Sequence, residues 1–325
     1  MASAVCTIYE GHYHYGVAAL CNSLYKNGFR GTVYVGYRGE LPPWATGAKD
    51  NQDLGWENGK TLKVADQLVI HFLPVETNYH FANFKPDFML QLMDGPAKEA
   101  GGMFYFDPDI IIKTAWNVFE SWIELGGIAC CADVNSPVPQ FHPKRMIWRD
   151  YFGQNGIRLQ FKGSEYVNSG FIGLKKENKD FLSLWKKIQE VIAPRIGGLI
   201  KSPFGGEHDL PDFEKTPIAA FSRTDQDALN ATIEAWEEGV VSIIDTEGMS
   251  FKFGPFLMSH ALGSPKPWKT KIFLSLVTGR FSGSILMDYW VNTAFPIALN
   301  SKTIINWNIF KIKASGFISR FYSRR

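Results

Sequence analysis

The stretch GMFYFDPDIII, Gly102–Ile112, carries the main fold signal of this chain together with its main chemical signal. An apolar, aromatic run typical of a buried strand leads into Asp107 and Asp109, and three isoleucines follow. A carboxylate in apolar surroundings without a partner is costly, so two of them this close together are rarely there for stability alone. The stretch therefore predicts a strand that ends at a site for a positively charged ligand.

Strand-like and helix-like segments alternate on both sides of this stretch. The segment Tyr15–Phe29 has apolar residues at helical spacing and an Asn27-Gly28 stop, and a second helix begins after Lys85 with Pro86 in its first turn. Strands are expected at Ala4–Tyr9, Gly31–Gly39, Gln67–Val75, Gly127–Val134 and Glu165–Lys176, and further helices at Asn178–Ile196 and Asp225–Gly239.

This order predicts an α/β fold, a mainly parallel sheet with helices on both faces. In such sheets ligands bind beyond the carboxyl ends of the strands, and Asp107 and Asp109 fall at such an end. The segment Lys201–Pro217 is rich in glycine, proline and acids and is expected to be a loop or lid.

The composition bounds the class of protein. The 325 residues are 45% hydrophobic with a net charge of +2, which suits a large buried core and excludes a nucleic-acid footprint for the whole molecule. Charge is uneven, because no acidic residue follows Asp288 whereas six basic residues do: Lys302, Lys311, Lys313, Arg320, Arg324 and Arg325.

The cysteines and the apolar segments indicate in which cellular compartment the protein is expected to lie. The spacing of Cys6, Cys21, Cys130 and Cys131 matches neither a disulfide framework nor a CxxC metal site, so we expect reduced core residues. We find no signal-peptide pattern and no run of about 18 apolar residues. The chain is expected to be cytoplasmic, at most lying peripherally on the inner face of a membrane.

The D-P-D pattern admits several interpretations. Two carboxylates at a strand end can face one hard divalent cation whose other positions take diphosphate oxygens and water. A capping turn or a solvated loop is the simple alternative. A phosphatase would need the motif early in the chain and Thr or Ser at position 111, where Ile111 stands, so that interpretation fails.

Three later segments supply matching groups. Phe256–Lys269 contains His260, Gly263 and Lys266, and an imidazole can complete a Mn²⁺ shell while a lysine meets phosphates. The alternative is an ordinary loop histidine. Two further groups also have structural alternatives: Asp225, Gln226 and Asp227 at a helix start, where carboxylates cap, and Asn168, Ser169 and Gly170 at a strand start, a bend or bulge.

The ordered set DPD, N-S-G, DQDALN and H-x-x-G-x-x-K-P-W resembles the GT-A glycosyltransferases of family 8, the glycogenin and lipopolysaccharide galactosyltransferase relatives. The resemblance covers residues 1 to about 270 and implies a Rossmann-like GT-A domain over 1–270, with a helical extension over 271–325. It implies that Mn²⁺ (or Mg²⁺) on a UDP-sugar is held by Asp107, Asp109 and His260. It further implies donor contacts from Lys266, the Gly263 backbone, Asn168, Ser169, Gly170 and Asp225, with Gln226 near the anomeric carbon.

Two positions depart from the family pattern. Lys85 stands where an arginine usually reaches the nucleotide, and lysine cannot make the planar bidentate contact. The opening TIYEGHYHYG lacks the usual aspartate and N-Y pair. Thr7 and Tyr9, at the end of the first strand, are expected to frame the uracil through backbone groups and stacking, and Glu10 and His12 to lie in a solvated loop.

The relatives retain the anomeric configuration. Asp225 or Gln226 is a candidate nucleophile for a double displacement, but glutamine is a poor one, so front-face attack by the acceptor hydroxyl is preferred. For the acceptor, the segment Ser136–Gly156 combines aromatics with His142, Lys144, Arg145 and Arg149, preceded by Asp133. It suits a glycan bearing phosphate or carboxylate, or it is an ordinary exposed loop.

The basic tail also has two interpretations. Apolar residues there lie among the cations, and they include Ile305, Trp307, Ile309, Phe310, Ile312, Phe317, Ile318 and Phe321. Such a helix either lies on an anionic membrane, which would fit a lipid-linked saccharide acceptor, or packs on the domain with its cations solvated.

Three classes of function compete. A nucleotidyltransferase would need a Gly-rich basic loop after the first strand, which YEGHYHYG does not provide. A non-catalytic nucleotide-sugar or glycan-binding module would be expected to lose metal ligands, yet Asp107, Asp109 and His260 remain. The sequence therefore favours a UDP-sugar-dependent glycosyltransferase.

Overall fold

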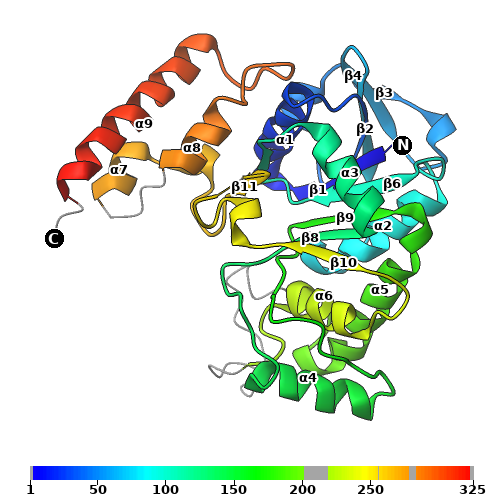
Figure 1. Cartoon of the computed structure of the whole chain (residues 1–325). Coiled ribbons are helices and arrows are strands. Elements are labelled where there is room, and N and C mark those ends of the chain that lie inside the picture. The colour runs from blue at the N-terminus through cyan, green and yellow to red at the C-terminus, as the bar shows by residue number, and fades with distance from the viewer. Residues whose placement is uncertain (1–2, 201–218, 255, 278–282, 323–325) are drawn as a thin grey trace.

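The computed structural model describes residues 3–200, 219–254, 256–277 and 283–322. The expected loop or lid at Lys201–Pro217 lies outside these residues. The central feature is a nine-stranded sheet of order β10-β8-β9-β6-β1-β2-β5-β4-β3 (Figure 1). Its strands are β1 (Ser3–Glu10), β2 (Gly31–Arg38), β3 (Lys49–Asp50), β4 (Lys60–Ala65), β5 (Leu68–Pro74), β6 (Gly102–Phe106), β8 (Ile128–Cys131), β9 (Phe171–Lys175) and β10 (Val241–Ile244).

The predicted mainly parallel sheet is confirmed. Strands β6, β1, β2 and β5 are parallel neighbours, as are β10 and β8, while β9 runs antiparallel between β6 and β8. The sequence analysis missed the antiparallel edge formed by β4 and β3. The hairpin between β4 and β5 turns at Asp66-Gln67, where Gln67 has a φ of 55° without the glycine typical of such turns.

Helices cover both faces of the sheet, as predicted. Helices α1 (His14–Lys26) and α3 (Trp116–Gly126) pack on one face through residues such as Leu20 and Phe119. The other face is covered by α2 (Lys85–Asp94), α5 (Asp180–Ile192) and α6 (Thr224–Ala235), with Phe88 and Trp185 in the core. Helix α4 (Pro143–Gln154) lies beyond α6 and adds Trp148 to the same core (Figure 1). The four cysteines are free and buried, in agreement with the sequence.

The strand that enters the D-P-D motif ends at the two aspartates, as predicted. It stops at Phe106, the chain turns through residues 107–109, and β7 (Ile110–Ile112) then pairs antiparallel with β11 (Met258–His260) in a separate two-stranded sheet. This register sets His260 opposite Ile110. The pairing therefore brings the histidine loop beside the two aspartates, although about 150 residues separate them in the chain.

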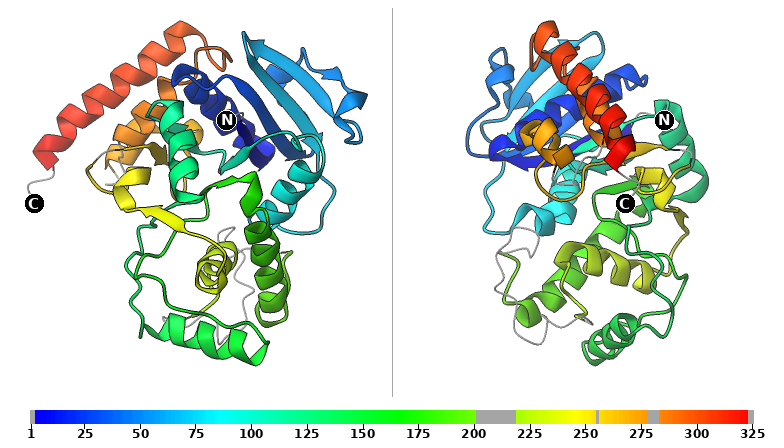
Figure 2. Two further views of the ribbon diagram at one scale, coloured as in Figure 1. Left: turned by 45° about the vertical axis from the view of Figure 1, so that its right-hand side comes forward. Right: turned by 90° about the vertical axis from the view of Figure 1, so that its left-hand side faces the viewer.

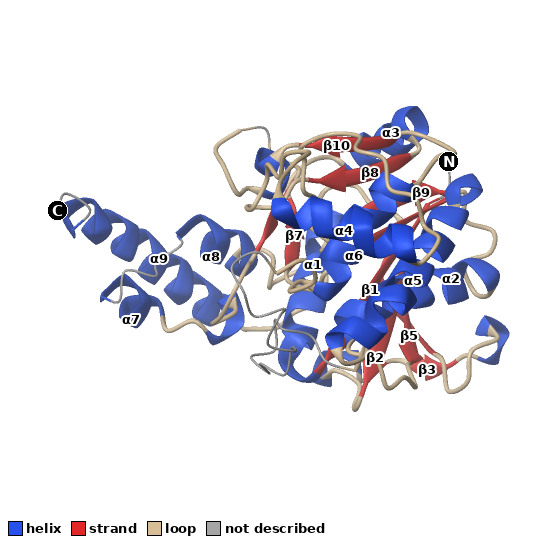
Figure 3. Ribbon diagram, turned by 90° about the horizontal axis from the view of Figure 1, so that it is seen from below, coloured by secondary structure: helices blue, strands red, loops and turns tan. Residues whose placement is uncertain are grey.

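The last three helices form a layer of their own. Helices α7 (Ile272–Val277), α8 (Gly283–Trp290) and α9 (Lys302–Tyr322) pack around Ile272, Leu286 and Ile312 and project to one side of the sheet domain (Figure 3). In the left view of Figure 2, α9 forms the outer edge of the molecule with α7 and α8 on its inner side. None of the helices in the described part of the chain is long and apolar enough to cross a bilayer.

Candidate active site

The two aspartates and the histidine predicted as metal ligands lie together. The Nε2 atom of His260 is 3.3 Å from Asp109 Oδ1 and 3.9 Å from Asp107 Oδ2. One ligand atom from each residue lies within 4.8 Å of those of the other two. Asp109 and His260 are buried, and Asp107 is partly exposed, so this metal-ligand cluster opens to solvent on the side of Asp107.

This cluster fits a divalent cation on two observations. Two carboxylates and one imidazole are donors that Mn²⁺ accepts, and the carboxylates suit Mg²⁺. Beside them lies Gly170, where a Cβ atom would sit 2.6 Å from His260 Cε1 and 2.9 Å from Asp107 Oδ2. Only glycine leaves that space open between the ligands, because any other side chain would push into it.

A lysine contacts each aspartate. Lys266 Nζ lies 2.5 Å from Asp109 Oδ2, and Lys85 Nζ lies 3.2 Å from Asp107 Oδ1. Burial alone would raise the pKa of Asp109, but the neighbouring His260 and Lys266 hold that pKa well below its ordinary value. Asp109 is therefore a carboxylate at any physiological pH, the form that a metal ion requires.

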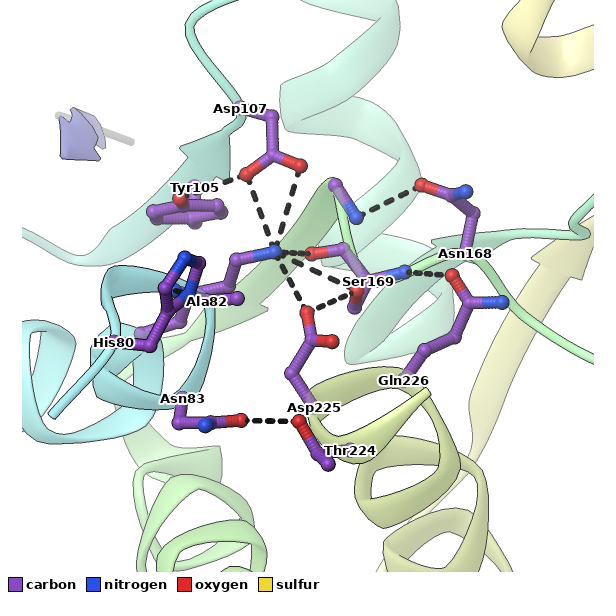
Figure 4. Close-up of polar contacts among 12 residues, drawn as sticks. His80, Ala82, Asn83, Tyr105, Asp107, Asn168, Ser169, Thr224, Asp225 and Gln226 are labelled. Atoms are coloured by element: carbon purple, nitrogen blue, oxygen red, sulfur yellow. Dashed lines mark hydrogen bonds and ion pairs between the residues drawn. The ribbon is translucent and has the colours of Figure 1, made fainter. Parts of the chain in front are cut away.

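A second cluster of polar groups adjoins the first through Lys85. Figure 4 shows Asp107, Ser169 and Asp225 around one lysine nitrogen. Lys85 Nζ lies 3.1 Å from Asp225 Oδ2, which also accepts a 2.6 Å hydrogen bond from the Ser169 hydroxyl. Burial alone would lower the pKa of Lys85, but Asp107 and Asp225 raise it overall, so the lysine stays charged.

Two buried atoms of this second cluster have unused hydrogen-bonding capacity. Asp225 Oδ1 has no hydrogen-bond partner among the described residues. Gln226 Nε2, beside the Tyr166 phenol, makes no hydrogen bond of normal geometry within the same part of the chain. Leaving such groups unpaired costs about 1–3 kcal/mol each, so their positions suit hydrogen bonds to a ligand.

Only one of the two aspartates of the D-Q-D segment, Asp227, caps the helix. Asp227 Oδ2 accepts a 2.8 Å hydrogen bond from the backbone N–H of Arg223, which is the capping role. Asp227 also binds Lys144 at 2.7 Å. Asp225 instead turns toward Lys85. The two carboxylates, two residues apart, therefore serve different purposes.

The N-S-G segment connects the two clusters. Asn168 donates to Asp133 Oδ2 at 2.7 Å and accepts from the backbone N–H of Gly170 at 2.8 Å, and the Gly170 carbonyl accepts from the N–H of Asp107. These bonds fix the backbone beside the D-P-D turn. Asp133 thus orients Asn168 through a direct hydrogen bond.

Thr7 and Tyr9, which were predicted to frame a uracil through backbone groups and stacking, have buried side chains in this structure. Strand β1 continues to Glu10, so both residues still belong to the sheet. Tyr9 is 2% exposed and its ring stacks on Tyr37, while Thr7 is fully buried, so neither side chain offers a face to a base.

A partly exposed aromatic residue near the metal-ligand cluster is Tyr13, which the sequence analysis missed. It ends the 3-10 helix Gly11–Tyr13, its ring centroid lies 5.8 Å from Lys266 Nζ, and it meets Trp268 edge to face. Trp268 in turn donates a 2.8 Å hydrogen bond to His12 Nδ1, so His12 does not lie in a purely solvated loop. The two aromatic residues directly after the first strand, His12 and Tyr13, were the sequence signal that could have located this side of the site.

The proposed acceptor segment is also corrected. Residues 143–154 form α4, not an exposed loop, and His142 accepts the N–H of Lys144 at the start of that helix. Lys144 and Arg145 are buried in ion pairs with Asp227 and Glu234. These two cations are therefore unavailable to an acceptor.

Gly263, whose backbone was predicted to contact the phosphates, lies in the loop after β11 with a φ of 72°.

Comparison with known proteins returns structures but no sequences. No protein-family model matches the chain, and no curated protein sequence matches it. Three solved structures are similar: WbbM (13% identity, TM-score 0.48), the galactosyltransferase LgtC with donor and acceptor sugar analogues (14%, 0.46), and GlyE of Streptococcus pneumoniae (14%, 0.48). All three are glycosyltransferases.

The matches differ in extent. They cover 96% of this chain and 51% of WbbM, 82% of this chain and 90% of LgtC, and 96% of this chain and 64% of GlyE. The chain thus spans about half the length of the WbbM structure. With TM-scores below 0.5, these matches carry no argument about function, which rests instead on the side chains of the site.

Proposed function

We propose that the chain is a metal-dependent glycosyltransferase that moves a sugar from a UDP-sugar to a glycan or lipid-linked acceptor. One observation supports this above all. The cluster of Asp107, Asp109 and His260 adjoins a second, buried cluster in which Asp225 Oδ1 has no partner among the described residues. A nucleotide-sugar needs both features side by side, since its diphosphate binds a metal and its sugar binds hydrogen-bonding groups.

The diphosphate end of the donor would lie against the metal-ligand cluster. A bound Mn²⁺ or Mg²⁺ would supply the Lewis acid that neutralises charge on the departing UDP. Lys266, whose nitrogen is already at this cluster, would donate to the phosphate oxygens, and the backbone of Gly263 on the same loop would add an N–H. Tyr13 would offer its ring to the base, because Tyr9 has no free face.

The sugar would lie against the second cluster. Asp225 Oδ1 would accept from a sugar hydroxyl and Gln226 Nε2 would donate to one, which satisfies two buried groups at once. Asn168, Ser169 and Gly170 would line this side. We favour retention by front-face attack, since Gln226 is a poor nucleophile and Asp225 is engaged by Lys85 and Ser169.

The acceptor would be reached from a membrane surface. The predicted apolar residues of α9 divide into two sets: Ile305 and Ile312 are buried, and Ile312 packs with α7 and α8, while Trp307 and Phe310 are each 57% exposed. Further exposed apolar residues on α9 are Ile304, Phe317 and Ile318. Together with Trp307 and Phe310 they recur along α9 at helical spacing, so they form an outer apolar stripe on that helix.

We propose that this outer stripe contacts an anionic membrane from the cytoplasmic side. The charge of the region supports that partner, because the residues after Asp288 include cations and no acids. Lys302 and Lys313 are exposed on the same helix, and Lys311 Nζ lies 5.9 Å from the Trp307 ring. Tryptophan beside lysine is the usual composition of an interfacial helix.

The test is isothermal titration of UDP into the protein with Mn²⁺ and with EDTA, on wild type and on Asp109→Asn. We expect affinity to fall at least about tenfold when either the metal or Asp109 is removed. Asp94→Asn is the control, because Asp94 pairs with Lys179 on the surface and should leave binding unchanged. Metal-independent binding would contradict the proposal, and metal-dependent binding without hydrolysis or transfer of any UDP-sugar would favour a non-catalytic module.

A further inference from the structure

The two lysines at the aspartates are held differently. Lys85 has a side chain only 4% exposed, and its nitrogen contacts Asp107, Asp225 and the Ser169 carbonyl at 3.0–3.2 Å. Removing it from this position would leave the buried carboxylate of Asp225 without a counter-charge, which is strongly unfavourable. Lys85 is therefore a fixed part of the structure.

Lys266 has fewer contacts and an easier way out. Its nitrogen contacts Asp109 Oδ2 at 2.5 Å and the Ala261 carbonyl at 2.8 Å, and the side chain is 14% exposed. It follows the loop 261–265 after β11 and carries four rotatable methylenes. The ammonium group can therefore swing away from Asp109 without any movement of the main chain.

A metal ion and the observed position of Lys266 compete for the same carboxylate. A cation held by Asp107, Asp109 and His260 would stand beside the Asp109 carboxylate, one of whose oxygens Lys266 occupies. Two positive groups so close together repel each other unless an anion joins them. The diphosphate of the donor is such an anion, and it needs a counter-charge of its own.

We infer that Lys266 is the counter-ion of Asp109 in the ligand-free protein and passes to the diphosphate when metal and donor bind together. This rests on the proposed function and deepens it, because it makes metal and nucleotide binding interdependent. Metal alone must displace Lys266 into solvent, and nucleotide alone must draw it from Asp109. Together they exchange one ion pair for another, so each strengthens the binding of the other by the same factor.

The charge state of Lys266 agrees with this role. Burial alone would lower the pKa of Lys266, but Asp109 beside it raises that pKa overall. The group is thus a cation throughout the neutral range, and no proton has to move when it changes partner. Tyr13, whose ring centroid is 5.8 Å from the nitrogen, lies next to it at the same edge of the site.

The experiment measures Mn²⁺ binding by the electron paramagnetic resonance signal of free Mn²⁺, with and without UDP. In Lys266→Met we expect Mn²⁺ alone to bind about tenfold tighter than in wild type, and UDP at saturating Mn²⁺ to bind about tenfold weaker. Lys266→Arg keeps the charge and should bind Mn²⁺ alone as weakly as wild type. Lys269→Met is the matched control, because Lys269 is an exposed lysine three residues further along the chain whose removal should change neither affinity.

The outcomes separate this inference from the proposed function. If Lys266→Met binds Mn²⁺ alone no tighter than wild type, or if UDP still tightens Mn²⁺ binding in that variant as much as in wild type, the exchange is disproved. If wild type and Asp109→Asn bind Mn²⁺ equally, the metal site itself is wrong. Tighter Mn²⁺ binding by Lys266→Met in a protein that transfers no sugar would uphold the exchange and contradict only the proposed reaction.

Discussion

Lys85 Nζ lies 3.1 Å from Asp225 Oδ2, so a residue at the start of α2 is paired with one at the start of α6 inside the protein. The same nitrogen contacts Asp107 at 3.2 Å. One buried ammonium group therefore joins the metal-ligand cluster to the second cluster, where the sugar is proposed to lie.

Replacing this lysine should be costly. In Lys85→Met, two carboxylates lose their buried counter-charge, and we expect the free energy of unfolding to fall by about 3–5 kcal/mol. Urea denaturation measures this. Lys179→Met is the matched control, because Lys179 pairs with Asp94 at the surface and its loss should cost less than about 1 kcal/mol. Equal losses in the two variants would contradict a structural role for Lys85.

Gln226 should affect the sugar but not the nucleotide. In Gln226→Ala the proposed donor to a sugar hydroxyl is removed, so we expect UDP-sugar to bind, or to be hydrolysed, about tenfold less well, while UDP alone binds as before. Titration of both ligands in the presence of Mn²⁺ separates these effects. Gln154→Ala, an exposed position on α4, is the control. A parallel loss for UDP would mean that Gln226 acts only through the fold.

Gly170 should be essential for metal binding. A Cβ atom there would lie 2.6 Å from His260 Cε1, so Gly170→Ala has to displace a metal ligand. We expect Mn²⁺ affinity to fall at least about tenfold with the fold retained, as judged by circular dichroism. Gly153→Ala on α4, with no atom within 4 Å of the added methyl, should leave binding intact. Unchanged Mn²⁺ affinity in Gly170→Ala would show that the metal does not use this space.

The outer stripe of α9 should bind anionic lipid. We expect the protein to sediment with vesicles containing phosphatidylglycerol and not with pure phosphatidylcholine, and Trp307→Ser/Phe310→Ser to lose about tenfold in this binding. Phe141→Ser/Phe253→Ser is the matched control, because it removes two other exposed aromatic side chains and should leave vesicle binding unchanged.

Charge reversal tests the same surface independently. Lys302→Glu/Lys313→Glu should weaken vesicle binding by at least about tenfold, since each lysine near the surface contributes about 1 kcal/mol. The same change at Lys49 and Lys63, exposed on the edge strands β3 and β4, should have little effect. Binding that ignores both lipid charge and these variants would contradict a membrane role. Concentration-dependent dimers that Trp307→Ser/Phe310→Ser abolishes would assign the stripe to a second copy of the chain.

His71 should make the fold sensitive to mild acid. Burial lowers the pKa of His71 to about 4, and its Nδ1 atom lies 2.8 Å from the Thr61 hydroxyl. The unfolded chain, with an ordinary pKa near 6.5, binds a proton first, so stability is full above about pH 6.5 and falls as the pH drops toward 4. Allowing for partial solvent screening, we expect a loss of about 1–2 kcal/mol. Urea denaturation at pH 7.5 and pH 4.5 measures this loss, and in His71→Gln the free energy of unfolding should differ less between the two pH values than in wild type. An equal difference in both proteins would show that His71 is not the cause of the acid sensitivity.

The sequence was sufficient for features that depend on neighbouring residues. Apolar runs and stop signals located most strands and helices, and the D-P-D motif marked a strand end. The edge strands β3 and β4 were missed because the turn before β5 places Gln67 at a positive φ, a conformation that sequence patterns predict for glycine or asparagine and not for glutamine. The burial of the Tyr9 ring was not foreseen, because β1 runs on to Glu10 and keeps Tyr9 within the sheet.

Features that depend on distant contacts could be inferred only from the resemblance. Nothing local tells that β11 pairs with β7, which sets His260 beside Asp109. Likewise, Lys144 and Arg145 looked like surface cations because their buried partners, Asp227 and Glu234, lie more than 80 residues away. Pairing across the fold decides which charges remain available to a ligand.

The four buried cysteines have a practical consequence for studying this molecule. Burial raises the pKa of the Cys21 and Cys130 thiols to about 12 and also raises those of Cys6 and Cys131, so at neutral pH all four are protonated and shielded from reagents. A single thiol introduced by Ser301→Cys, an exposed position just before α9, would then take up a maleimide fluorophore selectively. The four native cysteines therefore do not have to be removed before a fluorophore is attached next to α9 to report its approach to a lipid surface.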